Sequence, residues 1–362
     1  MKRFASLALV LLVALVAAPT AYGQAAPAPA AKPALARVVI LATGGTIAGV
    51  QPKEGEAGYK SGSVSVESLV NAAPGLEKLA QIRGEQIASI GSQDMNDFVW
   101  MKLARRATEL LAASDVDAIV VTHGTDTLEE TAFFLDLVLK TDKPVVLVGS
   151  MRPSTELSAE GPSNLYNAMA VAADPAARGR GVLVVANDTL HSARSIQKTN
   201  TTSVQTFISV NRGPVAEVLK GTKTQWYLPL AATGSKVNFP ITGLDALPRV
   251  DIVYAYENVD ATHVKAAIAA GAKGIVLAGV GDGNATADMI KALAEAAKSG
   301  VVVVRSTRVG SGTVRRNIEV DDDKMGFVAS LELNPQKARV LLRLGLTKTN
   351  DVKQIQKFFD EY

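Results

Sequence analysis

Short apolar runs alternate along the chain with longer segments of mixed character. Segments 128–139, 261–270 and 285–298 have the periodicity of helices. Seven runs rich in Val, Ile and Leu occur at residues 38–41, 118–121, 145–148, 182–186, 250–254, 275–280 and 301–304. Continuous runs of this kind are typical of strands covered on both faces. Strands alternating with helices predict an α/β fold with a mostly parallel sheet.

A break in this pattern divides the chain into two parts. Residues 227–248 mix Gly, Pro, Thr and Asn without clear periodicity, so they are interpreted as a linker. Four apolar runs precede the linker and three follow it. We therefore predict a larger N-terminal α/β domain over residues 37–226 and a smaller C-terminal α/β domain over residues 249–362.

The amino terminus has the pattern of a secretory signal peptide. Lys2 and Arg3 precede the apolar stretch 7–18, and small residues follow up to Gly23. This stretch is shorter than the roughly 20 residues that span a bilayer, which disfavours a membrane anchor. We predict a signal peptide over residues 1–23 and an Ala/Pro-rich spacer over residues 24–36. The mature protein is then expected to be periplasmic or secreted, without a membrane partner.

Composition excludes several kinds of chemistry. The chain contains no cysteine, which rules out disulfides, thiolate metal sites and cysteine catalysis. It has three histidines and no His-Glu-x-x-His helix, so no metal site is expected. The formal net charge is only +3, and no dense basic cluster is present. A nucleic-acid partner is therefore not expected.

Two glycine-rich turns follow predicted strands and concentrate candidate chemistry. Residues 43–46 (TGGT) come directly after the first strand, and residues 122–127 (THGTDT) after the second. The carboxyl ends of parallel strands are where α/β proteins build their sites. Thr46 follows two glycines and is a candidate nucleophile, which would need a base within hydrogen-bond reach. The alternative for Thr46 is a helix cap.

The second turn offers a hydroxyl beside a carboxylate. Thr125 and Asp126 end the predicted strand, whereas Thr127 and Glu130 are interpreted as a capping box for the following helix. Asp126 is suited to binding a substrate ammonium group, or to stabilising the first turn of that helix.

Two further polar clusters lie outside these turns. Lys198 is the one charged residue in the polar run 197–202 (QKTNTT). It is a candidate base in a dry site, or else a solvated surface lysine. Ser92 and Gln93 provide hydrogen-bond donors suited to a carboxylate, or begin an ordinary helix or loop.

Taken together, these motifs resemble the bacterial type II L-asparaginases, the exported branch of the asparaginase and glutaminase-asparaginase family. The resemblance extends from Arg37 to Tyr362. It rests on residues 40–49 (ILATGGTIAG), 91–96 (GSQDMN), 122–127 (THGTDT), 149–154 (GSMRPS), 198–202 (KTNTT) and 334–339 (NPQKAR).

The resemblance implies hydrolysis of L-asparagine to L-aspartate and ammonia through an acyl-threonine intermediate, without a cofactor. Thr46 matches the nucleophilic threonine of the family, and Tyr59 matches the tyrosine of a mobile lid, here within residues 51–61. Thr125 and Lys198 match a second hydroxyl and its lysine partner. Asp126 completes that arrangement and holds the substrate ammonium. The order in which the two hydroxyls react stays open.

The family also implies a two-domain α/β subunit that assembles into a homotetramer with sites shared between subunits. Ser92 matches a residue that binds the substrate α-carboxylate, and Gln93 is expected to contact the α-amino or carboxylate end. Asn284 and Glu319 resemble residues contributed by a neighbouring subunit.

Two alternatives to an asparaginase are considered. A glutaminase-asparaginase would hydrolyse L-glutamine about as well, and Asn284 favours asparagine because broader family members often carry serine there. A non-catalytic periplasmic amino-acid-binding protein would share the signal peptide and the two domains. It would have no need of two activated threonines and a lysine.

Overall fold

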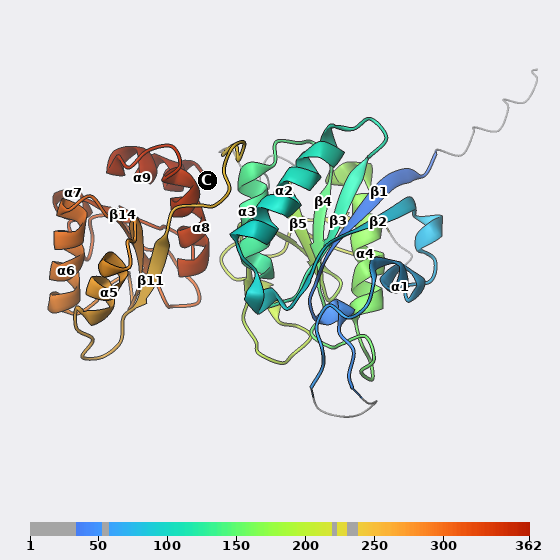
Figure 1. Cartoon of the computed structure of the whole chain (residues 1–362), viewed down its shortest axis with the longest axis horizontal. Coiled ribbons are helices and arrows are strands. Elements are labelled where there is room, and N and C mark those ends of the chain that lie inside the picture. Colours follow the sequence, from blue (N-terminus) through green and yellow to red (C-terminus); the bar gives the residue numbers. More distant parts are fainter. Residues whose placement is uncertain (1–33, 53–57, 219–222, 230–237) are drawn as a thin grey trace, which may run out of the picture. The chain divides into compact units, whose positions relative to one another are not determined.

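Two β-sheets of different size form the framework of the chain (Figure 1). The computed structural model describes residues 34–52, 58–218, 223–229 and 238–362. The predicted signal peptide, the spacer up to residue 33, lid residues 53–57 and linker residues 230–237 therefore lie outside the described residues. Among the described residues, no helix combines the length and apolar character needed to cross a membrane.

The larger sheet has the strand order β10-β9-β6-β5-β4-β3-β1-β2. Its strands are β1 (Ala36–Gly44), β2 (Ala80–Ile90), β3 (Ala118–Thr122), β4 (Val145–Val148), β5 (Val182–Ala186), β6 (Thr189–Ser192), β9 (Ala216–Glu217) and β10 (Gln225–Trp226). The strands β2, β1, β3, β4 and β5 run parallel to one another. Beyond β5, each of β6, β9 and β10 is antiparallel to the strand before it in the sheet. The four apolar runs predicted here are thus confirmed as β1, β3, β4 and β5.

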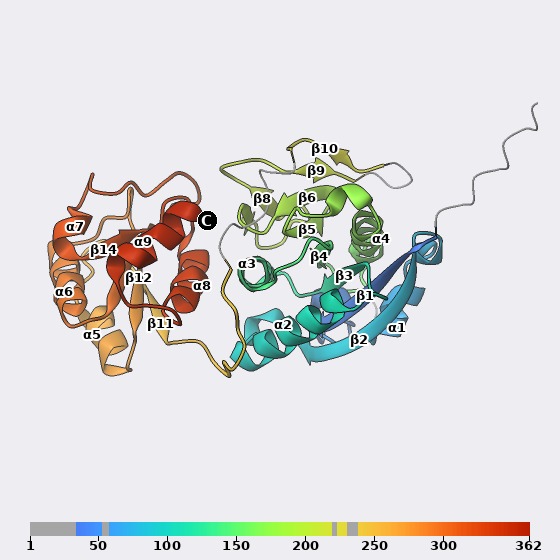
Figure 2. The same ribbon diagram turned by 90° about the horizontal axis from the view of Figure 1, so that it is seen from above.

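Helices cover both faces of the larger sheet, as Figure 2 shows. They are α1 (Val66–Asn71), α2 (Asp97–Ala112), α3 (Leu128–Val138) and α4 (Gly161–Ala172). Side chains alternate between the two faces of a strand. Accordingly, Val39 and Leu41 of β1 pack in one core with α2 and α3, whereas Val38 and Ile40 pack in another with α1 and α4.

The smaller sheet is entirely parallel, with the order β11-β12-β13-β14. Its elements are β11 (Val250–Tyr254), α5 (Thr262–Ala269), β12 (Gly274–Gly279), α6 (Ala287–Lys298), β13 (Val302–Thr307), α7 (Asp322–Met325), β14 (Phe327–Ala329), α8 (Pro335–Gly345) and α9 (Val352–Glu361). Ile275 and Leu277 pack with α5 and α6, while Val276 shares a core with α8. The predicted two-domain α/β class, with a larger mostly parallel N-terminal sheet, is confirmed.

A separate two-stranded ribbon, β7 (Ile196–Lys198) and β8 (Phe207–Ser209), is antiparallel and belongs to neither large sheet. Short 3₁₀ helices cover Thr46–Ala48, Leu76–Lys78, Ser92–Asp94 and Pro175–Ala177. β1 begins at Ala36, the last residue of the predicted spacer, which pairs with Ala80 in β2.

Candidate active site

The two threonine turns lie side by side because the strands that precede them are neighbours. β1 and β3 run parallel, and Ala42 is in register with Thr122. The hydroxyl of Thr43 donates a hydrogen bond to the carbonyl oxygen of Thr122 at 2.9 Å. The ends of the two strands are thus tied directly to each other. This role of Thr43 was not predicted from the sequence, although a threonine that ends a buried strand is a signal for it.

Glycine is required where the turns touch. Gly45 has a φ of +81°, and a Cβ atom on it would lie 2.2 Å from the backbone nitrogen of Gly124. A Cβ atom on Gly124 would lie 2.6 Å from the hydroxyl oxygen of Ser92. No side chain fits in these spaces, and the positive φ of Gly45 is strained for any other residue. The glycines therefore allow a close approach of the two turns that carry Thr46 and Thr125.

Thr46 lies at the start of the first turn's 3₁₀ helix, with its side chain buried. Its hydroxyl oxygen is 2.8 Å from that of Tyr59, and either group can donate the hydrogen bond. Val50 and Lys60 pair as an antiparallel bridge, which brings the two arms of this segment together. A Cβ atom on Gly49 would lie 2.8 Å from the Tyr59 ring, so this glycine leaves room for the ring.

Thr125, Asp126 and Lys198 form the second half of the site. The Lys198 ammonium donates to the Thr125 hydroxyl at 3.0 Å and to the Asp126 carboxylate at 2.6 Å. Thr125 is 5% exposed, and the side chain of Lys198 is 19% exposed. The alternative of a fully solvated surface lysine is therefore wrong. The side chain of Asp126 is 56% exposed, which leaves carboxylate surface open to a ligand.

A third loop joins this arrangement through Ser92. Its buried hydroxyl accepts a hydrogen bond from the backbone N–H of Asp126 at 3.1 Å. The Thr127 hydroxyl donates to the carbonyl oxygen of Ser92 at 2.7 Å. Gln93 is exposed, with its side chain against the backbone of Gly91. Ser92 is thus brought to the threonine turns, and Gln93 lies at the rim of the same loop.

The predicted capping box at Thr127 and Glu130 is wrong. Thr127 is the N-cap residue of α3, but its side chain accepts no hydrogen bond from the helix backbone. Its hydroxyl instead donates to Ser92, as described above. A tertiary partner has replaced the local one, so Thr127 joins two loops of the site.

His123 supports the second turn from within the protein. Its Nδ1 lies 2.7 Å from the carbonyl oxygen of Gly124, which can only accept, so Nδ1 carries the proton. Burial lowers the pKa of His123 to about 4. The ring is therefore neutral at pH 7 and acts as a hydrogen-bond donor to the backbone, a role that was not anticipated from the sequence.

Asn284 and Glu319 lie together in the C-terminal domain. The Asn284 side-chain amide donates to the Glu319 carboxylate at 2.8 Å. Beneath them, Arg305 forms a fully buried ion pair with Asp322 and donates to the carbonyl oxygens of Asp282 and Gly283. This arginine holds the turn that carries Asn284.

Neither Asn284 nor Glu319 reaches the threonine cluster by a hydrogen bond or ion pair within the described part of this chain. The described residues also contain no group of three or more His, Asp or Glu side chains that could hold a metal ion.

The fold and the site define a two-domain α/β protein whose paired threonine hydroxyls lie at neighbouring strand ends. Residues 37–231 match the family model described as "Asparaginase, N-terminal", and residues 249–359 match "Glutaminase/Asparaginase C-terminal domain". The chain therefore belongs to the asparaginase family.

Similar proteins agree with this assignment. L-asparaginase 2 of Escherichia coli (strain K12) is 53% identical over 329 residues, covering 91% of this chain and 94% of that protein. "Probable L-asparaginase periplasmic" of Haemophilus influenzae is 51% identical, covering 91% and 93%. The crystal structure of a probable cytoplasmic L-asparaginase from Campylobacter jejuni has a TM-score of 0.86 at 44% identity. It covers 90% of this chain and 100% of that one.

Proposed function

We propose that this protein hydrolyses L-asparagine to L-aspartate and ammonia through an acyl-threonine intermediate. The observation that carries the proposal is a pair of adjacent turns, each with a buried threonine whose hydroxyl has its own hydrogen-bond partner. Thr46 contacts Tyr59, and Thr125 contacts Lys198. A hydroxyl is a weak nucleophile at neutral pH and needs an adjacent group that accepts its proton. The names of the similar proteins support the same activity.

In the proposed reaction, Thr46 attacks the amide carbon of the substrate. Its hydroxyl proton passes to the neighbouring groups and then to the leaving nitrogen, so that the C–N bond breaks and ammonia departs. Water next attacks the resulting ester, which releases aspartate and restores the Thr46 hydroxyl. No redox step occurs, and the proposal requires no metal or cofactor.

Substrate orientation is assigned to the loops around the two threonines. Ser92 is proposed to hold the α-carboxylate, Gln93 to contact the α-amino or carboxylate end, and Asp126 to hold the α-ammonium group. Asp126 is suited to this because one oxygen accepts from Lys198 while more than half of its side chain stays exposed. Fixing both charged ends places the amide beside Thr46, and orientation of this kind supplies much of an enzyme's rate enhancement. Thr125 and Lys198 are proposed to activate the reacting groups and to relay protons between them.

A homotetramer is proposed as the active assembly. Asn284 donates a hydrogen bond to Glu319, and among the described residues neither forms a hydrogen bond or ion pair with the threonine cluster, which supports their donation to a neighbouring subunit's site. Mixing inactive Thr46→Ala subunits with inactive Asn284→Ala subunits tests this. Recovery of activity after co-refolding supports shared sites, and its absence from mixed oligomers contradicts them.

Export is also proposed, with residues 1–23 as the signal peptide, residues 24–36 as the spacer, and domains over residues 37–226 and 249–362 separated by the linker 227–248. The charged, apolar and small-residue regions of the first 23 residues support export. Amino-terminal sequencing of the protein secreted by its host tests the cleavage site. An intact Met1 in the cytoplasm would contradict it.

The central experiment is an ammonia-release assay on the mature protein with L-asparagine, L-glutamine and D-asparagine. We expect L-asparagine to be the preferred substrate. Thr46→Ala and Thr125→Val proteins should fold as the wild type does and lose nearly all activity. Full activity in both variants would reject the assignment. Tight asparagine binding without ammonia release would indicate a binding protein instead.

Glutaminase-asparaginase activity is the second candidate, because the C-terminal family description names both amides. Asn284 supports a preference for asparagine only through the family resemblance, in which broader members often carry serine at this position. The two activities are separated by measuring kcat/KM for both amides in one buffer. Comparable values would overturn that preference.

A further inference from the structure

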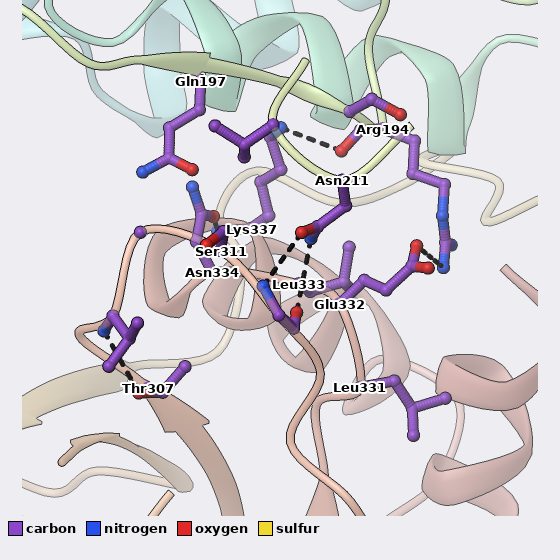
Figure 3. Close-up of a pocket in the computed structure, with 15 residues that line it drawn as sticks. Arg194, Gln197, Asn211, Thr307, Ser311, Leu331, Glu332, Leu333, Asn334 and Lys337 are labelled. Carbon is purple, nitrogen blue, oxygen red and sulfur yellow. Dashed lines mark hydrogen bonds and ion pairs between the residues drawn. The ribbon is translucent and has the colours of Figure 1, made fainter. Parts of the chain in front are cut away.

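The motif that begins α8 has no role in the proposed reaction, yet one of its side chains is buried against the site. Lys337 is 2% exposed. Its ammonium donates to the carbonyl oxygen of Arg194 at 2.9 Å and to that of Ile196. Figure 3 shows Lys337 extending from α8 toward the backbone beside Arg194. These two carbonyls flank the start of β7, the strand that ends at Lys198.

The same helix end also contacts α3. The Lys337 ammonium lies 3.9 Å from the carboxylate of Glu129, which is itself buried. Glu129 accepts a second contact from the side-chain amide of Gln336 at 2.6 Å. Glu129 is in the first turn of α3, three residues after Asp126. The amino-terminal end of α8 therefore contacts the chain close to Asp126 and close to Lys198.

The ribbon that carries Lys198 is supported by packing rather than by a large sheet. Among the described strands, β7 pairs only with β8, and this two-stranded ribbon is not part of either large sheet. A two-stranded ribbon is marginally stable unless it packs against other elements. Ile196 and Phe207 pack in the core that includes α3, and the Lys337 hydrogen bonds fasten the backbone at the start of β7. The hydrogen bonds from Lys198 to Thr125 and Asp126 depend on how β7 is held relative to α3. A lysine ammonium has three donors, and here two backbone carbonyls and one carboxylate surround it.

We propose that Lys337 is a positioning residue for the hydrolysis. It holds β7 against the start of α3, so that Lys198 stays within hydrogen-bond reach of Thr125 and Asp126. Lys337 does not touch the reacting groups and acts through Lys198. This inference rests on the proposed asparaginase activity.

Two variants of the full-length mature protein test the inference. Lys337→Met removes the ammonium while keeping a long apolar side chain. The double variant Lys337→Met with Glu129→Gln also neutralises the buried carboxylate, so that no unpaired charge opposes folding. Lys143→Met is the matched control, because Lys143 donates in the same way to the backbone carbonyl of Ala113, where it has no contact with the site.

We expect kcat for asparagine to fall about ten- to a hundredfold in both Lys337 variants, because small displacements of a catalytic group have effects of this size. The fold-change in KM should be at least three times smaller than the fold-change in kcat. The pH profile of kcat should also change, because a displaced Lys198 would no longer hold the Thr125 hydroxyl and the Asp126 carboxylate in the wild-type geometry. Lys143→Met should keep the wild-type kcat and pH profile even if its melting temperature falls.

Wild-type kcat and pH profile in the folded double variant would overturn the inference. So would an equal loss of kcat in Lys143→Met, because the effect would then be general destabilisation. If the wild type releases no ammonia from asparagine, the proposed function fails instead, and the two failures are thereby distinguished.

Discussion

The ammonium of Lys198 lies 2.6 Å from the carboxylate of Asp126, although the two residues are 72 positions apart in the sequence. Lys198 comes from the β7–β8 ribbon, and Asp126 from the turn between β3 and α3. More than half of the Asp126 side chain is exposed, and solvent around one partner weakens what an ion pair contributes to stability. The contact is therefore better explained by chemistry at Thr125 than by folding.

Lys198→Met should separate these two explanations. Loss of the ammonium removes the partner of both Thr125 and Asp126, so kcat should fall by about 10²- to 10⁴-fold, the range for a positioned proton-transfer group. The melting temperature should stay within a few degrees of the wild type. Lys348→Met, at an exposed position, serves as the control and should keep full activity. More than a tenth of wild-type activity in Lys198→Met would count against a role in the reaction.

Thr46 is expected to be the acylated residue. During turnover of asparagine, acid quenching followed by peptide mass spectrometry should find an aspartyl adduct on the peptide that contains Thr46. The reason is that Thr46 has a neighbouring hydroxyl on Tyr59, whereas the Thr125 oxygen accepts from an ammonium. The Thr46→Ala protein should give no adduct under the same conditions. An adduct on Thr125 would reverse the assignment of the two hydroxyls.

Gly45→Ala should damage both stability and activity. A methyl group there meets the Gly124 backbone nitrogen at 2.2 Å, at a φ of +81° that disfavours any side chain. We expect the free energy of unfolding to fall by about 1–3 kcal/mol, as for other overpacked sites, with most activity lost as the turns separate. Gly213→Ala is the control, because Gly213 has a similar φ of +73° but nothing within 4 Å. Chemical denaturation measures the loss of stability, and ammonia release measures the loss of activity. Equal losses in Gly45→Ala and Gly213→Ala would contradict the close-approach explanation.

Stability should fall at acidic pH partly because of His123. Burial lowers its pKa in the folded protein from 6.5 to about 4, so between these values the unfolded chain binds more protons than the folded one. The stabilisation is present above pH 6.5 and is lost as the pH falls toward 4. At 1.36 kcal/mol per pH unit, the loss is roughly 3 kcal/mol.

Denaturation curves at several pH values between 7 and 4 measure this effect. His123→Asn is the comparison, because an asparagine amide can donate to the Gly124 carbonyl without titrating. The variant should lose less stability than the wild type over this range. The same acid sensitivity in both proteins would place its origin in other groups, of which His191 is one, since burial lowers its pKa to about 4 as well.

The sequence was most informative where side-chain pattern alone decides the structure. All seven apolar runs are strands. Six of them are buried on both faces, as continuous runs of β-branched residues predict, whereas β11 is an edge strand that leaves Ile252 and Tyr254 exposed. β2 was missed because it is an edge strand whose residues alternate irregularly between buried and exposed. Helix α2 and the short strands β6, β9 and β10 were also not anticipated. Helix α2 did carry a local signal, because Asn96 caps it and buried residues recur along one face. The short strands lack such a signal and depend on neighbours supplied by the rest of the chain.

By itself, the sequence determined the α/β class, the two glycine turns and the residues that resemble those of an asparaginase. Only the tertiary structure decided which groups meet. It paired Thr46 with Tyr59 and Thr125 with Lys198, turned the Thr127 hydroxyl from its helix to Ser92, and buried Lys337 against the start of β7. The physical reason is that a hydrogen bond acts over about 3 Å, whereas sequence pattern carries no information about which distant segments pack at that distance.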